Sequence, residues 1–463
     1  MIISNDIAMQ VLNEALKTGG DFAEIYAEDK KSLSLSMADK ALENAVSGRS
    51  HGVGIRVFKE TNSVYVYTND SSLAGLMDAA GQAAAAIEGT KSLGIDIVLK
   101  HKAIQTAHPI LVAPHTVELS QKVDIVKRAY STASSYDALI KQTSVRYADS
   151  VTNVQIINSE GLNVEDERFL TRLAISAVAS DGKENQTGYE SPGSQMGFEF
   201  YRDHLDIEAY AKEAGRTAVT MLKAPACPAG KMTAAIESGF GGVIFHEACG
   251  HSLEATSVAR GQSVFCGKMG EKIASDVLTA VDDATLTNEW GSFNIDDEGN
   301  PGQRNVLIEN GVLKSYLVDK LNGRRMNASP TGSGRRQSYA FAPTSRMSNT
   351  FIAPGSSTKD EIISSIDDGL YCAKLGGGSV NPITGEFNFL VSEGYLVKNG
   401  KIASPVRGAS LIGKGHEVLF NIDMVGDNLA HAQGMCGSIS GSIPVNVGQP
   451  IIRVSEILVG GKS

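Results

Sequence analysis

The sequence has little cysteine: only five residues, an odd number, scattered along 463 positions. Such a set does not form a disulfide framework, so we expect a protein of the reducing cytoplasm. No run is long and apolar enough to span a bilayer, and the first residues lack the basic and apolar regions of a signal peptide. Positive charge is not in excess, and the net charge of −10 disfavours nucleic-acid phosphates. We therefore expect no membrane and no nucleic-acid partner.

The remaining composition is typical of a folded protein with more than one domain. Hydrophobic residues make up 42% of the chain and charged residues 20%, and the length exceeds one typical core. A break at 223–230, with Pro225, Pro228 and Gly230, is the predicted domain boundary. The predicted fold class is α+β. Residues 1–224 would form an N-terminal domain of antiparallel strands and long helices, and residues 225–463 a mostly β C-terminal domain.

Hydrophobic periodicity predicts the main elements. Alternation and turn signals predict strands at 32–37, 52–57, 63–67, within 144–200, and at 232–237, 306–308, 316–318 and 395–397. Amphipathic spacing predicts helices at 5–18, 71–87, 116–133, 206–222 and 358–366, and a buried helix that begins near residue 241. The strands before residue 70 are expected to form an antiparallel meander.

Two histidines flank a glutamate in that buried helix, in the run His246-Glu247-Ala248-Cys249-Gly250-His251. The zinc-protease motif H-E-x-x-H is one residue shorter. In a regular helix of about 100° per residue, the two imidazoles here would point roughly 140° apart. Sharing one ion requires the helix to end or widen between them, and Gly250 could permit either a terminus or a π-type bulge. The competing interpretation is a pair of ordinary buried histidines.

A catalytic zinc site needs a third protein ligand and one open position. Glu254 and a cysteine are the candidates. Cys436 is the best cysteine, because the small residues around it would let a thiolate approach an ion closely. Cys249 is expected to face away from the metal. Only a folded domain could bring Cys436 to His251, so a metal held by both would also stabilise this half of the chain.

The run from His246 to Glu254 resembles that of the TldD/PmbA family of zinc metallopeptidases, on the TldD side. The resemblance extends to 294–299, 330–336, 376–378, 436–437 and 444–450, and more loosely to 52–57 and 68–70. It implies that His246, His251 and Cys436 bind Zn²⁺ and that Glu247 is the catalytic residue. PmbA-type members lack the metal motif, so this chain resembles a catalytic subunit.

The resemblance implies a zinc-dependent peptidase in which Glu247 activates a zinc-bound water to hydrolyse unfolded or extended peptides. It also implies a dimer, formed with a second copy or with a PmbA-type subunit, around an enclosed active site. Glu254 would orient an imidazole. The alternative is a non-catalytic partner protein that acts through protein–protein contacts. The natural peptide, the cleavage preference, the residues that stabilise the oxyanion and the kind of dimer stay open.

Two further groups of charged residues have alternative interpretations. The acidic run Asp296-Asp297-Glu298 is expected to be a solvated turn rather than a cation site, because it lacks the spacing of an EF-hand loop. The loop that carries Arg335 and Arg336 is either a solvent loop with surface ion pairs or a functional loop that holds a carboxylate or an oxyanion.

Overall fold

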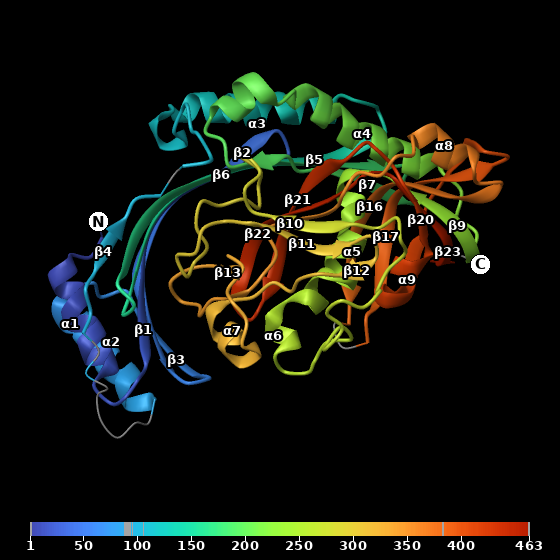
Figure 1. Ribbon diagram of the computed structural model, residues 1–463. Coiled ribbons are helices and arrows are strands. Elements are labelled where there is room, and N and C mark those ends of the chain that lie inside the picture. Colours follow the sequence, from blue (N-terminus) through green and yellow to red (C-terminus); the bar gives the residue numbers. More distant parts are fainter. Residues whose placement is uncertain (1, 88–93, 95, 105, 382–383, 462–463) are drawn as a thin grey trace.

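The structure, a computed structural model, describes residues 2–87, 94, 96–104, 106–381 and 384–461. Its N-terminal part is a long curved sheet that arches over the C-terminal part (Figure 1). In spatial order, the strands of the arch are β3 (Asn62–Thr68), β2 (Ala41–Lys59), β1 (Phe22–Ala38), β5 (Ile140–Asn158), β6 (Leu162–Ser180) and β4 (Lys100–Lys102), while β7 (Asn185–Glu190) and β8 (Gly193–Ser194) also pair with β6.

Four helices cover the outer, convex side of the arch (Figure 1). They are α1 (Asn5–Leu16), α2 (Leu73–Ala86), α3 (Leu119–Ser134) and α4 (Ile207–Lys223), with shorter turns η1 (Pro114–Thr116) and η2 (Phe200–His204). One apolar cluster joins α1 and α2 to β1 and β2, and a second joins α3 and α4 to β5 and β6. These clusters bury the convex side and leave the concave side to face the C-terminal part.

The C-terminal part contains a sheet that closes on itself. The pairing of β16 with β17 completes a ring of five strands, each of which is paired with two neighbours in the ring. Its strands are β16 (Asp368–Val380), β9 (Gly230–Ile236), β23 (Ile452–Gly460), β19 (Ser410–Lys414) and β17 (Glu386–Lys398), with β18 (Lys401–Val406) and β20 (Ile422–Val425) attached.

A second C-terminal sheet has β21 at its edge. In spatial order its strands are β12 (Val312–Leu313), β11 (Arg304–Glu309), β10 (Ala280–Asp283), β15 (Asn349–Ile352), β22 (Gly441–Gln449) and β21 (Ala430–Ser438), and β13 (Gly334–Arg335) pairs separately with β14 (Thr344–Ser345). The short helices are η3 (Gly239–Gly242), α5 (Val243–Ala248), η4 (Gly250–Leu253), α6 (Ala255–Val258), α7 (Lys320–Met326), α8 (Lys359–Ser364) and α9 (Gly415–Asn421). Helix α5 packs between the two sheets, against β16 and β17 on one side and β15 and β22 on the other.

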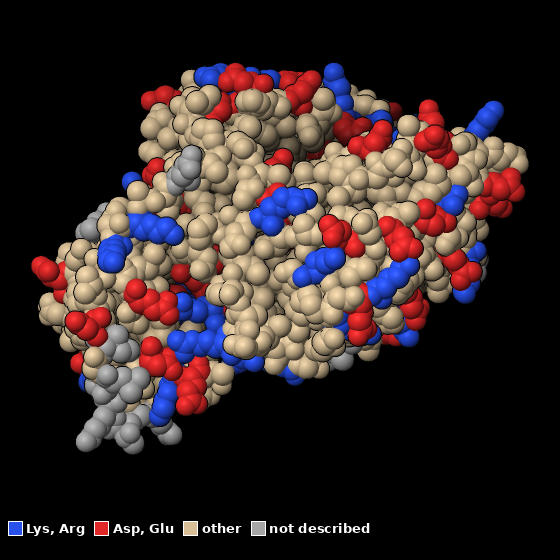
Figure 2. Space-filling view, in the orientation of Figure 1, with Lys and Arg blue, Asp and Glu red and all other residues tan. Residues whose placement is uncertain are grey.

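The predicted α+β class is confirmed, and the four N-terminal helices lie where the sequence predicts them. The strand predicted at 316–318 is wrong, because Leu317 forms only an isolated bridge with Glu254. The domain boundary at 224 and 225 stays a prediction. Among the described residues, no helix is both long and apolar enough to cross a membrane. Acidic and basic side chains are interspersed over the face of the molecule seen in Figure 2.

Candidate metal centre

The helix that carries the first histidine ends before it reaches the second. Helix α5 stops at Ala248, Cys249 leaves the helical conformation with φ −129° and ψ −48°, and the tighter turn η4 begins at Gly250. The change in helical phase brings the two imidazole rings together. The ring centroids of His246 and His251 are 5.1 Å apart, and the ring planes are nearly perpendicular at 84°.

Gly250 is needed for space. A Cβ at this position would lie 2.3 Å from Sδ of Met347, which is far inside van der Waals contact. The backbone break itself falls on Cys249, a residue whose side chain is fully buried in the apolar core. The sequence predicts that Gly250 permits the distortion of the helix. In the structure, the absence of a side chain at Gly250 instead allows η4 to pack closely against Met347.

Cys436 reaches the two histidines from the far end of the chain. It lies on the edge strand β21, opposite Ile443 on β22. Its Sγ is 3.3 Å from Nε2 of His246 and 3.3 Å from Nε2 of His251. One ligand atom from each of the three residues lies within 4.8 Å of the others. The structure therefore brings together the three residues that the sequence singled out as metal ligands.

The donor set fits zinc in kind and in spacing. Imidazole nitrogen and thiolate sulfur are ligands that zinc prefers, and His246 and Cys436 are buried from solvent. With bonds of about 2.0 Å to nitrogen and about 2.3 Å to sulfur, a tetrahedral site separates those two atoms by about 3.5 Å. The observed 3.3 Å separations are close to that value. A single cation could therefore be held with little movement of the side chains.

The electrostatics of the cluster favour the thiolate that a metal requires. Burial alone would raise the pKa of the Cys436 thiol, but the two neighbouring imidazoles outweigh burial and lower this pKa to about 3. Burial would lower the pKa of His251, but Glu254 and Cys436 outweigh it and raise the pKa of this imidazole well above its usual value. The positive charge of the imidazoles thus stabilises the Cys436 thiolate, as a bound divalent cation would.

Two glutamates contact His251 in different ways. Oε2 of Glu254 lies 3.1 Å from Nδ1 of His251, and this carboxylate is buried. Glu247 keeps 28% of its side chain exposed, and its Oε2 lies 3.7 Å from Nε2 of His251. Glu254 is therefore placed to fix the ring, whereas Glu247 stands at the more open side, near the ligand atoms.

Sequence reasoning missed Arg346, which is fully buried behind the cluster. Its guanidinium donates hydrogen bonds to the carbonyl of Cys436 and to Oγ of Ser440, and its Nε lies 3.9 Å from Oε1 of Glu254. It thus links the strand of the sulfur ligand to the carboxylate that contacts His251. The sequence offers no signal for this role, because Arg346 belongs to no recognisable motif.

The imidazole of His246 has less hydrogen-bond support than that of His251. Nδ1 of His246 is buried and has no hydrogen-bond partner among the residues that the structure describes. Metal-bound histidines usually donate this hydrogen bond to a carboxylate or a carbonyl. The support for the two imidazoles is therefore asymmetric, and Glu254 serves only His251.

The two other groups of charged residues, the acidic run and the arginine loop, are buried. This corrects the prediction for the acidic run and excludes the solvent loop as an interpretation of the arginine loop. Asp296, Asp297 and Glu298 are each at most 3% exposed, so the prediction of a solvated turn is wrong. Arg335 and Arg336 are buried as well, so their loop is not a solvent loop. Sequence reasoning failed here because the ion-pair partners of Glu298 and Arg336, which are Arg56 and Glu24, lie far away in the chain.

Comparison with known proteins places the chain in a family. Models of the PmbA/TldA metallopeptidase match over their domain 1 at residues 23–87, central domain at 113–222 and C-terminal domain at 229–461. A metalloprotease TldD homolog of Haemophilus influenzae is 36% identical over 95% of this chain and 93% of its own length. A metalloprotease of Methanothermobacter thermautotrophicus is 35% identical over 95% of this chain and 96% of its own.

Solved structures share the fold at lower identity. TldE from Thermococcus kodakarensis aligns with a TM-score of 0.78 at 19% identity, covering 98% of this chain and all of its own. A proposed modulator of a DNA gyrase from Thermotoga maritima aligns with a TM-score of 0.80 at 22% identity, covering 98% of this chain and 99% of its own. On the strength of the family models and the close relatives, the chain belongs to the TldD/PmbA family of metallopeptidases.

Proposed function

We propose that this protein is a zinc-dependent peptidase whose metal ligands are His246, His251 and Cys436. The observation that carries the proposal is the approach of one sulfur and two imidazole nitrogens to within 4.8 Å of one another. A relative from Saccharolobus solfataricus, 28% identical over 74% of this chain, is named a zinc metalloprotease TldD homolog. Three protein ligands leave one position open, as in catalytic zinc sites.

Glu247 is the proposed general base. When bound, zinc supplies Lewis acidity, which lowers the pKa of a water at its open position towards about 7. With the metal bound, the Glu247 carboxylate would accept a proton from the attacking water and donate it to the leaving amine. The partial exposure of Glu247 and its 3.7 Å separation from Nε2 of His251 support this role. Glu254 holds the His251 ring by the contact to Nδ1.

The proposed substrate is an unfolded or extended peptide. Cys436 lies on β21, the edge strand of its sheet, so the backbone of a peptide could pair beside the ligand-bearing strand. We further propose that the protein forms a dimer, either with a second copy or with a PmbA-type subunit, in the cytoplasm. The size of the purified chain in solution tests whether a second copy suffices.

Replacement of Glu247 tests the proposal. We expect Glu247→Gln to retain zinc, measured by elemental analysis, and to cleave a fluorogenic unfolded peptide at least about 100-fold more slowly, the contribution typical of a general base. Glu271→Gln is the matched control, because that carboxylate is exposed and forms an ion pair with Lys268 at 3.5 Å. Cleavage that survives in Glu247→Gln would remove the base from the mechanism. Absence of both zinc and cleavage in the unaltered protein would favour a non-catalytic partner instead.

A further inference from the structure

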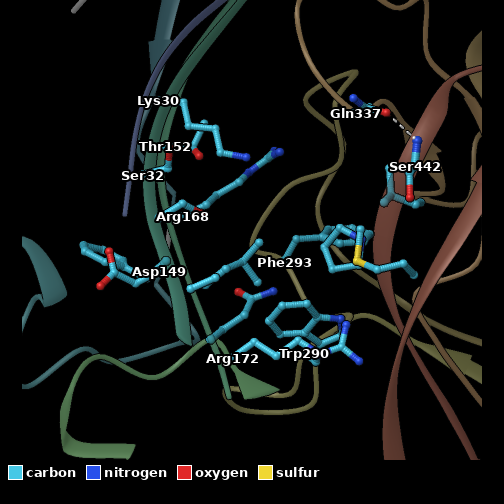
Figure 3. A pocket seen from close by; sticks show the side chains of 18 of the residues that line it. Lys30, Ser32, Asp149, Thr152, Arg168, Arg172, Trp290, Phe293, Gln337 and Ser442 are labelled. Carbon is cyan, nitrogen blue, oxygen red and sulfur yellow. Dashed lines mark hydrogen bonds between the residues drawn. The ribbon is translucent and has the colours of Figure 1, made fainter. Parts of the chain in front are cut away.

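A second candidate site lies between the arch and the C-terminal part. It is a cavity of about 660 Å³. One wall is the concave face of β1, β5 and β6, and the other carries Trp290, Phe293 and residues of β22 (Figure 3). His246, Glu247 and His251 do not line it. The proposed catalytic residues therefore do not account for the side chains gathered here.

Strand register places cations on both flanks of the first wall. Lys30 on β1, Thr152 on β5 and Arg168 on β6 stand opposite one another in one row. Arg172 lies four residues further along β6, opposite Ala148, on the same face of the sheet. At a rise of about 3.3 Å per residue, Arg168 and Arg172 are about 13 Å apart. The row between them carries Ser32, Ser150 and Leu170, so two hydroxyl groups and one apolar side chain separate the cations.

Arg172 has no carboxylate partner. Its guanidinium donates to the carbonyl and hydroxyl oxygens of Ser191 at 3.3 and 2.8 Å and to the carbonyl of Gln433 at 3.2 Å. It also lies over the ring of Trp290, 5.3 Å from the centroid. Among the described residues, neither Arg172 nor Lys30 forms an ion pair with an aspartate or a glutamate. The charge of Lys30 nevertheless opposes the burial that raises the pKa of Glu28, so this cation is partly compensated. Arg172 is therefore the less compensated of the two cations.

Arg335, on the opposite wall, also lacks a carboxylate partner, and its charge is buried. Its guanidinium donates to the carbonyls of Met347 and Pro444 at 2.6 and 2.9 Å and lies 5.0 Å from the ring centroid of Phe293. Within the described part of the chain, it forms no ion pair, and burial lowers the pKa of this guanidinium to about 10. Burying a guanidinium without a counterion is costly. A carboxylate in the cavity would offset that cost.

Four carboxylates line the cavity, and two of them have a cationic partner. Glu28 accepts the backbone N–H of Tyr339 at 3.1 Å, and Asp296 accepts hydrogen bonds from Asn300 and from the backbone N–H of Gly334, without an ion pair among the described residues. Asp149 accepts hydrogen bonds from Lys122 at 2.6 Å and from Tyr147 at 2.7 Å. Asp297 is paired with Arg168 at 2.5 Å and accepts the backbone N–H of Arg336. Six basic side chains face these four carboxylates, so the walls carry an excess of positive charge although the whole chain carries a net charge of −10. The basic residues are Lys30, Arg146, Arg168, Arg172, Arg335 and Arg336.

We propose that this cavity binds an extended peptide segment that carries carboxylate side chains. The cations on either side of the row of Ser32, Ser150 and Leu170 suit acidic side chains that project from an extended backbone at intervals. The rings of Trp290 and Phe293 provide apolar surface that a small inorganic anion would not use. This inference rests on the proposed function in one respect: it names acidic peptides as the preferred substrate class of the peptidase.

Binding, measured without cleavage, tests the proposal. In a Glu247→Gln background, fluorescence anisotropy compares a labelled peptide of alternating Glu and Ala with the same peptide in which Gln replaces Glu. We expect the Glu peptide to bind about tenfold more tightly, and Lys30→Gln or Arg172→Gln each to weaken its binding about tenfold, as for a hydrogen bond to a charged group. Lys31→Gln is the matched control, because this neighbour of Lys30 removes the same charge but does not line the cavity.

Each outcome decides the question. Equal binding of the two peptides, or an equal loss in Lys31→Gln, would overturn the proposal. Displacement of the Glu peptide by a thymidine oligonucleotide at equal concentration would overturn the choice of a peptide ligand. If circular dichroism shows that Arg172→Gln is unfolded, Lys30→Gln decides alone. Binding of the Glu peptide without cleavage by the unaltered protein would refute the peptidase and leave the cavity site standing, whereas cleavage without a preference for Glu would do the reverse.

Discussion

Sγ of Cys436 and Nε2 of His251 lie 3.3 Å apart, although 185 residues separate them in the chain. The sulfur belongs to an edge strand and the imidazole to the turn that follows a helix. A metal held by both atoms would connect β21 to the packing of α5 and η4 between the two C-terminal sheets. Metal binding should therefore affect both the chemistry and the stability of this half of the protein.

Loss of the sulfur should abolish metal binding. We expect Cys436→Ser to lose its zinc, because a neutral hydroxyl does not replace a thiolate as ligand, and to unfold at a lower temperature than the zinc-loaded protein. Elemental analysis and thermal unfolding with and without a chelator measure both effects. Cys266→Ser is the control, because that thiol donates a hydrogen bond to the carbonyl of Val258 and does not belong to the candidate ligand cluster. A full complement of zinc in Cys436→Ser would exclude this residue as a ligand.

Glu254 should tune the affinity for metal. Glu254→Gln preserves the shape of the side chain but removes the charge next to Nδ1 of His251. Removing such an outer partner typically weakens metal binding by about 10- to 100-fold. Competition against a zinc-binding dye measures the change. An unaltered zinc affinity would show that the contact with His251 has no part in metal binding.

Close packing at Gly250 predicts a steric effect on the site. In Gly250→Ala, the new methyl group would meet Sδ of Met347 at 2.3 Å, so either the buried Met347 side chain or η4, which carries His251, must shift. We expect a loss of roughly 1–3 kcal/mol in the free energy of unfolding, as for an overpacked core, together with weaker zinc binding. Gly377→Ala is the control, because a Cβ there meets no atom within 4 Å. Equal effects of the two substitutions on denaturant unfolding and zinc content would contradict the steric explanation.

The motif itself could be predicted because helical geometry is regular. A spacing of five residues between His246 and His251 is incompatible with one uninterrupted helix that serves one ion, so an interruption follows from the sequence. Cys436 was singled out by its small neighbours. Arg346 could not be predicted, because its role depends on where the backbone of β21 lies, and tertiary pairing alone decides that.

Buried charges are the main failure of the sequence-based predictions. Charged runs usually face solvent, yet Glu298 and Arg336 are buried where the arch meets the C-terminal part. Arg336 pairs with Glu24 at 2.7 Å, and Arg56 pairs with Glu24 at 2.9 Å and with Glu298 at 2.6 Å. Arg56 and Glu298 are 242 positions apart in the chain, and Arg336 and Glu24 are 312 positions apart. Local sequence patterns carry no information on such compensation.

Removing Arg56 should therefore be costly. We expect Arg56→Met to lose about 3–5 kcal/mol in the free energy of unfolding, because Glu24 and Glu298 would stay buried with less compensation. Burial raises the pKa of Glu298 to about 7 although Arg56 opposes this shift. A raised folded-state pKa favours folding below the unfolded value and penalises it as pH rises. The deficit should therefore be larger at pH 8 than at pH 5.

Denaturant unfolding at these two pH values measures the deficit of Arg56→Met. The control is Arg49→Ala, which removes an exposed guanidinium that pairs with Asp29 and should leave the unfolding midpoint nearly unchanged. A deficit in Arg56→Met that shrinks as pH rises would refute the assignment to uncompensated carboxylates.

Glu237 lies at the end of the strand that leads into η3 and α5. Its contribution to stability should increase as pH rises, whereas that of Glu298 decreases. Burial would raise the pKa of Glu237, but hydrogen bonds from Lys359 and Tyr371 outweigh it and lower this pKa to about 2. A lowered folded-state pKa stabilises the protein above the unfolded value of about 4.5, and the gain is lost as pH falls towards 2. We expect Glu237→Gln to cost at most about 3 kcal/mol at pH 7, and the difference from the unaltered protein to shrink between pH 4.5 and 2. Chemical unfolding across this range, at constant ionic strength, measures it. A difference that is independent of pH would mean that the carboxylate stabilises through packing rather than through its charge.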